Sequence, residues 1–165
     1  MSEGQFTHVS PEGQPKMVDI SDKAVTKRTA RARAIVNPGK EILDALADGE
    51  IITKKGPVFQ TAIIAGVMGA KKTSELIPFC HPIALEDCQI NILVKGDKIV
   101  IDSTAVVSGK TGVEMEALSA ATVAALTVYD MCKALSHDIV IESIQLLEKT
   151  GGKKDIRKDQ PPTTA

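Results

Sequence analysis

Residues 108–135 read SGKTGVEMEALSAATVAALTVYDMCKAL, and this segment decides the fold that we expect. Its middle consists of Ala, Leu, Val and Met, with no Gly or Pro after Gly112. Helix propensity therefore favours a continuous helix of roughly twenty residues. Because most of the circumference of this helix is apolar, it should be buried between other elements.

A stripe of polar residues interrupts the apolar surface of this helix. At about 100° per residue the stripe covers an arc of roughly 140°. Its members are Glu116, Ser119, Thr122, Thr127, Asp130 and Lys133. The stripe either faces water or lines a polar cavity. A solvated face usually carries several Lys and Glu residues, so the small number of charges favours the cavity.

Glu114 does not fit the stripe if the helix is regular at that point. Residues two apart point nearly opposite ways on a helix, but the same way on an extended segment. If Glu114 and Glu116 serve one site, the helix should therefore start near Glu116.

The other segments complete a simple order of elements. Alternating patterns predict strands at residues 29–36, 88–94, 98–107 and 139–147, with a hairpin at Gly96 and Asp97. A short helix is expected at 40–47, after the Asn37-Pro38 cap, and an apolar helix at 58–69. The β-α-β-β-α-β order predicts an α+β, ferredoxin-like domain, with long helices on one face of an antiparallel sheet.

The composition restricts the class of protein. The 165 residues carry a net charge of −1 and only 2% aromatic residues, which argues against binding to nucleic acid. The three cysteines lack paired spacing, a pattern that suits a reducing cytosol. No targeting pattern or bilayer-length apolar run is present, so we expect a cytoplasmic protein without a membrane partner. The polar ends, residues 1–16 and 155–165, are expected to be flexible, and residues 17–154 to form one domain.

Several lysines lie in or beside glycine-containing or polar turns. Such turns suit phosphate groups, although each one alone is most simply a solvated turn. These lysines are Lys54, Lys55, Lys71, Lys72, Lys110, Lys153 and Lys154. The Gly109-Lys110-Thr111 sequence does not complete a P-loop, because position 104 is Thr where that spacing requires Gly.

His81 lies in a loop that is stiffened by Pro78 and Pro82. Three roles are open for it: an interior histidine, a metal ligand, or a proton-transfer and phosphate-binding group. The metal role lacks companions, because the cysteines and His137 show no ligand spacing with it.

Asp130 is the strongest single candidate for chemistry. It has apolar neighbours on both sides, and a carboxylate is costly to bury without a partner. Lys133, one turn further on, can keep it charged and is itself a candidate acid or phosphate ligand. The alternative is an ordinary salt bridge on the surface.

Glu116 and Asp130 lie on nearly the same face of the predicted helix, about 21 Å apart along its axis. One compact substrate cannot easily contact both. Three explanations are open: the ligand is long, a neighbouring subunit completes the site, or the two residues belong to different half-sites. The second explanation predicts an oligomer with shared sites.

Five motifs, in order and at the expected spacing, closely resemble the molybdenum cofactor biosynthesis protein C family, the cyclic pyranopterin monophosphate synthases. They are KGPVF at 55–59, LIPFCHP at 76–82, GKTGVEMEA at 109–117, YDMCKA at 129–134 and GGK at 151–153. The resemblance runs from about Met17 to Lys153.

This resemblance implies a lyase that rearranges 3′,8-cyclo-7,8-dihydro-GTP into cyclic pyranopterin monophosphate and releases pyrophosphate. It also implies a ferredoxin-like fold and a hexamer, a trimer of dimers with sites at the dimer interface. An upstream radical cyclase supplies the substrate. No redox cofactor is expected, although Mg²⁺ bound with the triphosphate is compatible with the reaction.

The resemblance also assigns roles to residues. Asp130 is the acid–base residue, and Lys55, Lys133 and His81 join it in catalysis. The remaining substrate-binding residues are Arg28, Phe79, Cys80, Glu114, Met115, Glu116 and Lys153, with Lys154 as the alternative to Lys153. The competing hypothesis is a non-catalytic ferredoxin-like module that binds a phosphorylated ligand.

Overall fold

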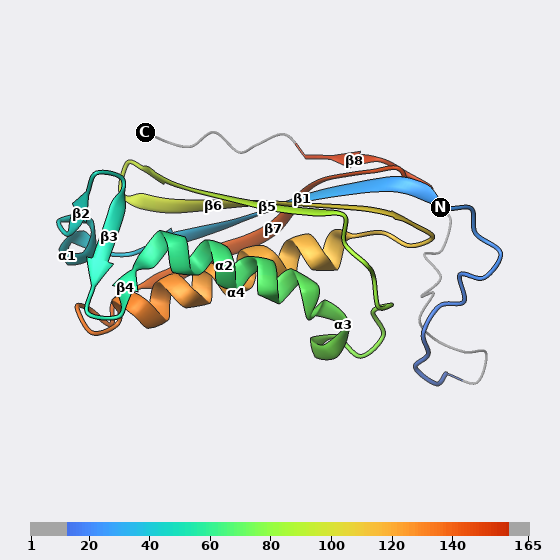
Figure 1. The fold of residues 1–165 in the computed structure, drawn as a ribbon, viewed down its shortest axis with the longest axis horizontal. Helices are drawn as coiled ribbons and strands as arrows, with labels where there is room; N and C mark the ends of the chain where they lie inside the picture. Colours follow the sequence, from blue (N-terminus) through green and yellow to red (C-terminus); the bar gives the residue numbers. More distant parts are fainter. Residues whose placement is uncertain (1–12, 159–165) are drawn as a thin grey trace.

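The computed structural model of the chain describes residues 13–158, and its centre is a five-stranded antiparallel sheet. The strand order is β5-β6-β1-β7-β8. Two long helices cover one face of this sheet (Figure 1). The expected β-α-β-β-α-β order and ferredoxin-like arrangement are therefore confirmed. The strands are β1 (Thr26–Asn37), β5 (Asp87–Lys95), β6 (Lys98–Gly109), β7 (Val140–Thr150) and β8 (Ile156–Arg157), and the helices are α2 (Val58–Lys71) and α4 (Glu114–Cys132).

Short elements connect the first strand to the first long helix. They are α1 (Lys40–Leu43), β2 (Leu46–Ala47), β3 (Glu50–Thr53) and β4 (Gly56–Pro57), and α3 (Thr73–Leu76) follows α2. The prediction of a helix through residues 40–47 was wrong in its second half. There the chain turns through Asp48 and Gly49, both with positive φ, and Leu46 and Ala47 pair with β3.

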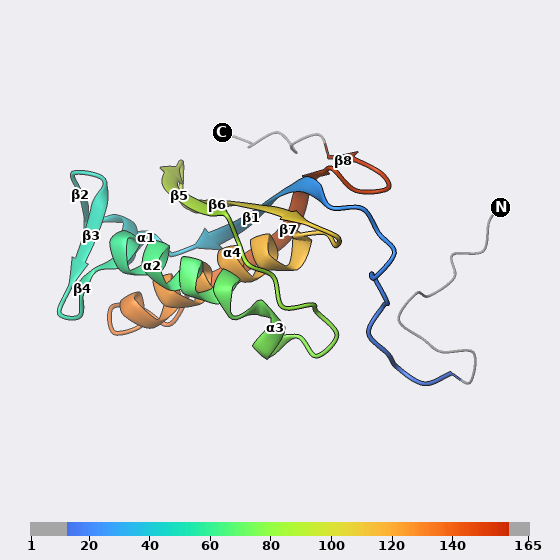
Figure 2. The same cartoon turned by 45° about the vertical axis from the view of Figure 1, so that its right-hand side comes forward.

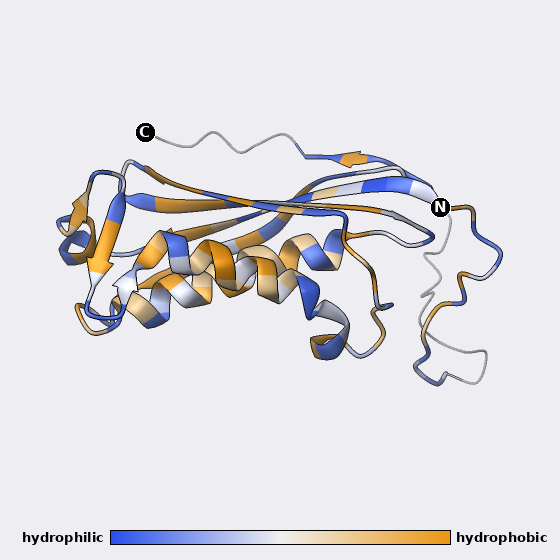
Figure 3. Ribbon diagram, in the orientation of Figure 1, coloured by the Kyte–Doolittle hydropathy of each residue, from blue (hydrophilic) through white to orange (hydrophobic). Residues whose placement is uncertain are grey.

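Small side chains fill the layer between the sheet and α4. Ala30, Ala32 and Ala34 of β1 are fully buried. Their alternation along the strand turns all three toward the same face. Five alanines of α4 are equally buried: Ala117, Ala120, Ala121, Ala124 and Ala125. Apolar and weakly polar residues accordingly make up much of both long helices (Figure 3). Ala120 and Ala124 also lie against Gly66 of α2. The small side chains therefore let α4 pack closely on both the sheet and α2.

Glycines in α2 allow an equally close approach between the two helices. A Cβ at Gly66 would overlap Cδ1 of Ile90 and lie 2.9 Å from the carbonyl oxygen of Ala120. At Gly69 a Cβ would lie 2.6 Å from Cγ2 of Val123. The two helices are therefore held at a distance that a larger residue at position 66 would increase.

The ends of the chain were expected to be flexible, and residues 1–12 and 159–165 of those ends lie outside the described residues. Within the expected C-terminal tail, Ile156 and Arg157 form β8 and pair with Lys149 and Glu148 of β7. None of the helices in residues 13–158 has both the length and the hydropathy needed to cross a bilayer.

Gly66→Ala should lower the free energy of unfolding. Overpacking against the backbone oxygen of Ala120, which cannot shift by itself, should cost about 2–3 kcal/mol, and the better helix propensity of alanine returns about 1 kcal/mol, so we expect a net loss of roughly 1–2 kcal/mol. Gly109→Ala is the control with little expected loss, because its new methyl group would lie 3.7 Å from its nearest neighbour, the side chain of Val107, which is an ordinary contact distance. Urea unfolding at a fixed protein concentration measures both. A Gly66→Ala protein as stable as the wild type would contradict the close packing.

Candidate active site

The candidate site residues form two groups at opposite ends of α4 (Figure 1). One group surrounds the N-terminal end of the helix, where it meets the loop after α3 and the N-terminal segment. The other group surrounds the last turn of the helix and the turn between β3 and β4. Within one chain, the structure does not bring the two groups together.

A cavity of about 730 Å³ opens at the N-terminal end of α4. The loop after α3 contributes Phe79, Cys80 and His81, and α4 contributes Glu114, Met115 and Glu116. These six residues, together with Lys153, are seven of the substrate-binding candidates. Other lining residues are Val18, Asp19, Ile20, Lys23, Ile83, Thr111, Gly112 and Lys149.

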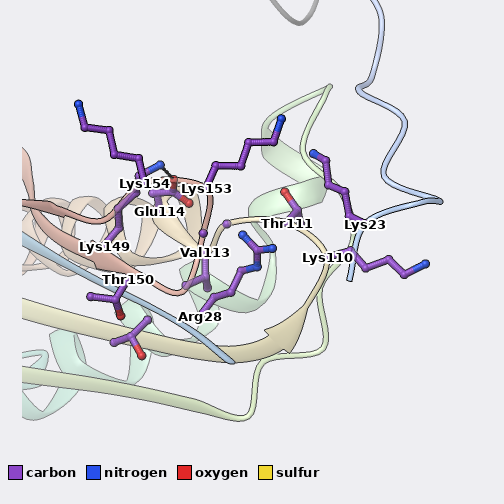
Figure 4. A pocket seen from close by; sticks show the side chains of 13 residues that line it. Lys23, Arg28, Lys110, Thr111, Val113, Glu114, Lys149, Thr150, Lys153 and Lys154 are labelled. Carbon is purple, nitrogen blue, oxygen red and sulfur yellow. Dashed lines mark hydrogen bonds and ion pairs between the residues drawn. The ribbon is translucent and has the colours of Figure 1, made fainter. Parts of the chain in front are cut away.

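A second pocket, of about 230 Å³, adjoins this cavity and is strongly cationic (Figure 4). Its charged lining residues are Lys23, Arg28, Lys110, Glu114, Lys149, Lys153 and Lys154. The pocket and the cavity share six lining residues: Lys23, Thr111, Gly112, Glu114, Lys149 and Lys153. The two hollows therefore form one continuous site with a cationic end.

Two neighbouring lysines of the glycine-rich turn differ in their placement. Lys153 reaches toward Lys23 and lines both hollows, whereas Lys154 extends the other way and lines only the smaller one (Figure 4). The turn itself requires Gly151, which has a φ of 80° and lies against the backbone of Lys27.

Glu114 is the first residue of α4, so the prediction that the helix starts near Glu116 was wrong. The helix begins after Val113 without a side-chain cap, and the two acidic residues of its first turn complement its dipole. Glu114 nevertheless belongs to the site, because its Oε1 accepts a 2.7 Å hydrogen bond from Nζ of Lys149. A regular helix turns Glu114 away from Glu116, but the bond from Lys149, on β7, holds the Glu114 carboxylate at the cavity.

Glu116 is the buried acid of the cavity. It is only 3% exposed. Burial raises the pKa of Glu116 to about 7, and the charge of Glu114 adds to the increase. Burial and the nearby Glu116 charge also raise the pKa of the Cys80 thiol. Glu116 can therefore exchange a proton near neutral pH, as a general acid or base requires.

The N-terminal segment forms one wall of the cavity. Nε2 of His81 lies 2.8 Å from the carbonyl oxygen of Val18, and Nζ of Lys110 donates a 2.6 Å hydrogen bond to the carbonyl oxygen of Ser21. Figure 2 shows this segment running past the end of the molecule that carries α3. Because a carbonyl only accepts, Nε2 of His81 carries the hydrogen, and Nδ1 is the acceptor in the neutral ring.

Asp130 forms the centre of the second group. Its Oδ2 lies 2.7 Å from Nζ of Lys55, and its Oδ1 lies 2.7 Å from Nζ of Lys133. The hydrogen bond from Lys133, followed by that from Lys55, lowers the pKa of Asp130 to about 2. Lys55 also donates a 2.9 Å hydrogen bond to the carbonyl oxygen of Asp130. This carbonyl is one of the last in the helix, where backbone acceptors lack helical partners.

The expectation that Asp130 is a buried carboxylate was wrong, since its side chain is 54% exposed in the chain. Its neighbours Met131 and Cys132 point into the core, while Asp130 is on the outer side of the last turn. The polar stripe therefore has two environments. It lines a cavity at Glu116 and faces solvent at Asp130 and Lys133.

Lys23, Thr111 and Lys149 are among the lining residues that were missing from the sequence-based site. Lys149 lies just before the glycine-rich turn that carries Lys153 and Lys154, and this basic segment was a usable signal. The predicted strand ended at residue 147, so the sequence did not show that Lys149 belongs to β7 and bonds Glu114. Lys23 lies in a segment without periodicity. No group of three or more His, Cys, Asp or Glu residues within 13–158 is arranged to hold a metal ion.

The pKa of Glu116 predicts a pH-dependent stability. The folded-state pKa of about 7 lies above the ordinary value of 4.5. The folded protein therefore binds the extra proton, and this contribution to stability is fully present below pH 4.5 and lost as the pH rises through 7. We expect the loss to be on the order of 3 kcal/mol at pH 8.

Glu116→Gln, which mimics the protonated acid, should remove this decline. Urea unfolding at pH 5 and pH 8 measures it, with Glu75→Gln on the exposed surface of α3 as the control. An equal decline in wild type and Glu116→Gln would show that Glu116 titrates normally.

Comparison with known proteins shows the family of this chain. The MoaC family model matches residues 17–152. The chain is 47% identical to "Molybdenum cofactor biosynthesis protein 1" of Dictyostelium discoideum, covering 93% of the chain and 27% of that relative. The protein of the same name from Drosophila melanogaster is 50% identical, with 95% and 28% covered. The "Molybdenum cofactor biosynthesis bifunctional protein" of Synechocystis sp. is 50% identical, with 92% and 45% covered.

The chain thus spans between 27% and 45% of the length of these three relatives. The family match nevertheless covers most of the chain itself, and it includes both groups of candidate site residues except Lys153 and Lys154. This chain belongs to the MoaC family.

Proposed function

We propose that this chain acts in molybdenum cofactor biosynthesis as a cyclic pyranopterin monophosphate synthase. It would convert 3′,8-cyclo-7,8-dihydro-GTP into cyclic pyranopterin monophosphate and release pyrophosphate. The names of the three relatives support the pathway. The observation that carries the reaction is the cationic pocket that opens onto the cavity of Glu116.

The cationic pocket suits the triphosphate. Arg28, Lys110 and Lys153 come from three separate segments and line the same small hollow. Pyrophosphate leaves when the bond between the α-phosphorus and its bridging oxygen breaks and a ribose oxygen takes its place on that phosphorus. Negative charge grows on the departing pyrophosphate in this step, and fixed cations stabilise that charge.

The larger cavity suits the purine-derived rings. Opening and rebuilding these rings needs several proton transfers. Glu116, with a pKa of about 7, can give or take a proton at neutral pH. The Nδ1 atom of His81 is a second acceptor, because the hydrogen bond to Val18 occupies Nε2.

Asp130, Lys55 and Lys133 supply the second half of the proposed site. Since α4 keeps them about 21 Å from Glu116, we propose that a second copy of the chain brings its own half to the same ligand. The assembly is a homohexamer, a trimer of dimers, with each site at a dimer interface. The family resemblance and the separation of the two groups both support this arrangement.

The proposed setting is the cytoplasm, where an upstream radical cyclase supplies the substrate. The reaction has no redox step, so no flavin, haem or nicotinamide is required. Mg²⁺ carried by the triphosphate is compatible with the cationic pocket, which also holds the Glu114 carboxylate.

The alternative function is a non-catalytic module that binds a phosphorylated ligand. Such a module needs the lysines but has no use for a buried acid that titrates near 7. Incubation of the chain with 3′,8-cyclo-7,8-dihydro-GTP, followed by an assay for pyrophosphate, separates the two functions. Release no faster than in the protein-free control would favour the alternative.

In the same assay, Asp130→Asn should reduce turnover by at least about 100-fold, as expected for loss of a proton-transfer group. The substitution keeps the shape of an exposed side chain, so the thermal midpoint and ligand affinity should change little. Asp138→Asn, an exposed acid just beyond α4, is the control. Turnover by Asp130→Asn at the level of this control would remove Asp130 from the mechanism.

Shared sites predict complementation between two inactive variants. In a dimer of one Asp130→Asn chain and one His81→Ala chain, one site carries both defects and the other carries neither. After random exchange of equal amounts, about a quarter of the wild-type activity should return. Subunit exchange is confirmed by native mass spectrometry. An exchanged mixture that stays inactive would show that each site lies within one chain.

A further inference from the structure

The N-terminus of α2 receives its cap from outside the helix. Pro57 precedes the first helical residue and offers no side-chain acceptor. The carboxylate of Glu50, on β3, takes this role. Its Oε1 accepts a 2.8 Å hydrogen bond from the backbone N–H of Phe59, and its Oε2 accepts a 3.1 Å bond from that of Gln60. These are the second and third residues of α2, whose N–H groups a capping residue normally satisfies.

The same carboxylate therefore ties β3 to α2. Glu50 begins β3, and Ile52 and Thr53 of that strand pair with Pro57 and Gly56 of β4. Between these strands, Oγ1 of Thr53 accepts a 3.2 Å hydrogen bond from the backbone N–H of Lys55. The backbone of Lys55 is thus held in a turn whose two strands are joined at one end to α2 through Glu50.

This turn faces the last turn of α4. Nζ of Lys55 reaches both the carboxylate and the carbonyl oxygen of Asp130. Strands β3 and β4 lie beside this end of α4 (Figures 1 and 2), and the charge of Glu50 adds to burial in raising the pKa of the Cys132 thiol to about 11. The Glu50 carboxylate therefore fixes the β3–β4 hairpin against α2, in the region where Lys55 meets Asp130.

We propose that Glu50 is the positioning residue of the Lys55–Asp130 pair: by capping α2 it sets the β3–β4 turn at the distance from which Lys55 reaches Asp130. The importance of this pair for turnover rests on the proposed function, but its geometry does not. Strand β4 continues directly into α2 at Val58, so the Glu50 carboxylate is what ties the other strand of the hairpin, β3, to the same helix. Without it, two N–H groups of α2 lose their acceptor, β3 loses this tie, and Lys55 no longer holds Asp130.

The titration of Asp130 tests this proposal without any substrate. In protein labelled with ¹³C at aspartate carboxyl groups, Lys55→Ala should move the NMR titration midpoint of Asp130 upward, because one of its two lysine partners is lost. Glu50→Ala should produce an upward shift of similar size. The double variant should show no further shift beyond that of Lys55→Ala.

The sign of the shift separates positioning from simple electrostatics. Removal of the Glu50 charge alone would lower the midpoint of Asp130, because one nearby anion is gone. Release of Lys55 raises it. An unchanged or lowered midpoint in Glu50→Ala would overturn the proposal, as would a double variant whose shift equals the sum of the two single shifts.

Two further variants complete the test. Glu50→Gln keeps the shape of the side chain and one acceptor oxygen, so it addresses a failure of Glu50→Ala to fold. We expect a smaller upward shift, and no upward shift would overturn the proposal. Glu41→Gln, on the exposed surface of α1, removes the same charge from a side chain that does not cap α2, and should leave the midpoint unchanged.

The outcome is independent of the proposed function. If wild type and Glu41→Gln release pyrophosphate but Glu50→Ala leaves the Asp130 midpoint unaltered, the positioning role is wrong and the function stands. If Asp130 shifts as expected but wild type releases no pyrophosphate, Glu50 still positions Lys55 and the proposed reaction is wrong.

Discussion

The length of α4 is the constraint on which the candidate site depends. A helix rises 1.5 Å per residue, so Glu116 and Asp130 are held about 21 Å apart on one rod. The rod cannot bend to bring them together, because its buried alanines lie against the sheet and Gly66 holds α2 against it. One compact ligand therefore contacts only one end of α4 in a given chain. Under the proposed function, the two ends of the helix serve two different sites of the assembly.

The main elements of the fold could be predicted from sequence because each has a strong local pattern. The strands at β5 and β6 alternate, Gly96 marks their turn with a φ of 58°, and α4 has an uninterrupted helical composition. The second, three-stranded sheet, of order β2-β3-β4, could not be predicted. Its strands β2 and β4 have two residues each, too short for any periodicity, and their pairing depends on the turn at Asp48 and Gly49.

The same difference between local patterns and long-range pairing decides which site residues could be predicted. Residues in compact motifs, such as Phe79, Cys80 and His81, lie together in space because they are adjacent in a stiff loop. Lys149 is 35 residues from Glu114, and only the arrangement of β7 beside α4 makes them a pair. The exposure of Asp130 could not be predicted either, since apolar neighbours in sequence do not reveal which side of a last helical turn faces solvent.

The two acids of α4 are tuned in opposite directions, and this difference constrains any mechanism. Glu116 is buried, and its pKa rises to about 7. Asp130 lies between two lysines, and its pKa falls to about 2, so in the chain alone it is too weak a base for efficient proton transfer near neutral pH. An anionic substrate that draws Lys55 or Lys133 toward its phosphates would raise the pKa of Asp130. The exposed position of Asp130 permits this exchange of partners, since a ligand can reach both lysines from outside the chain. In the proposed reaction, binding of the triphosphate would therefore also prepare the carboxylate for proton transfer.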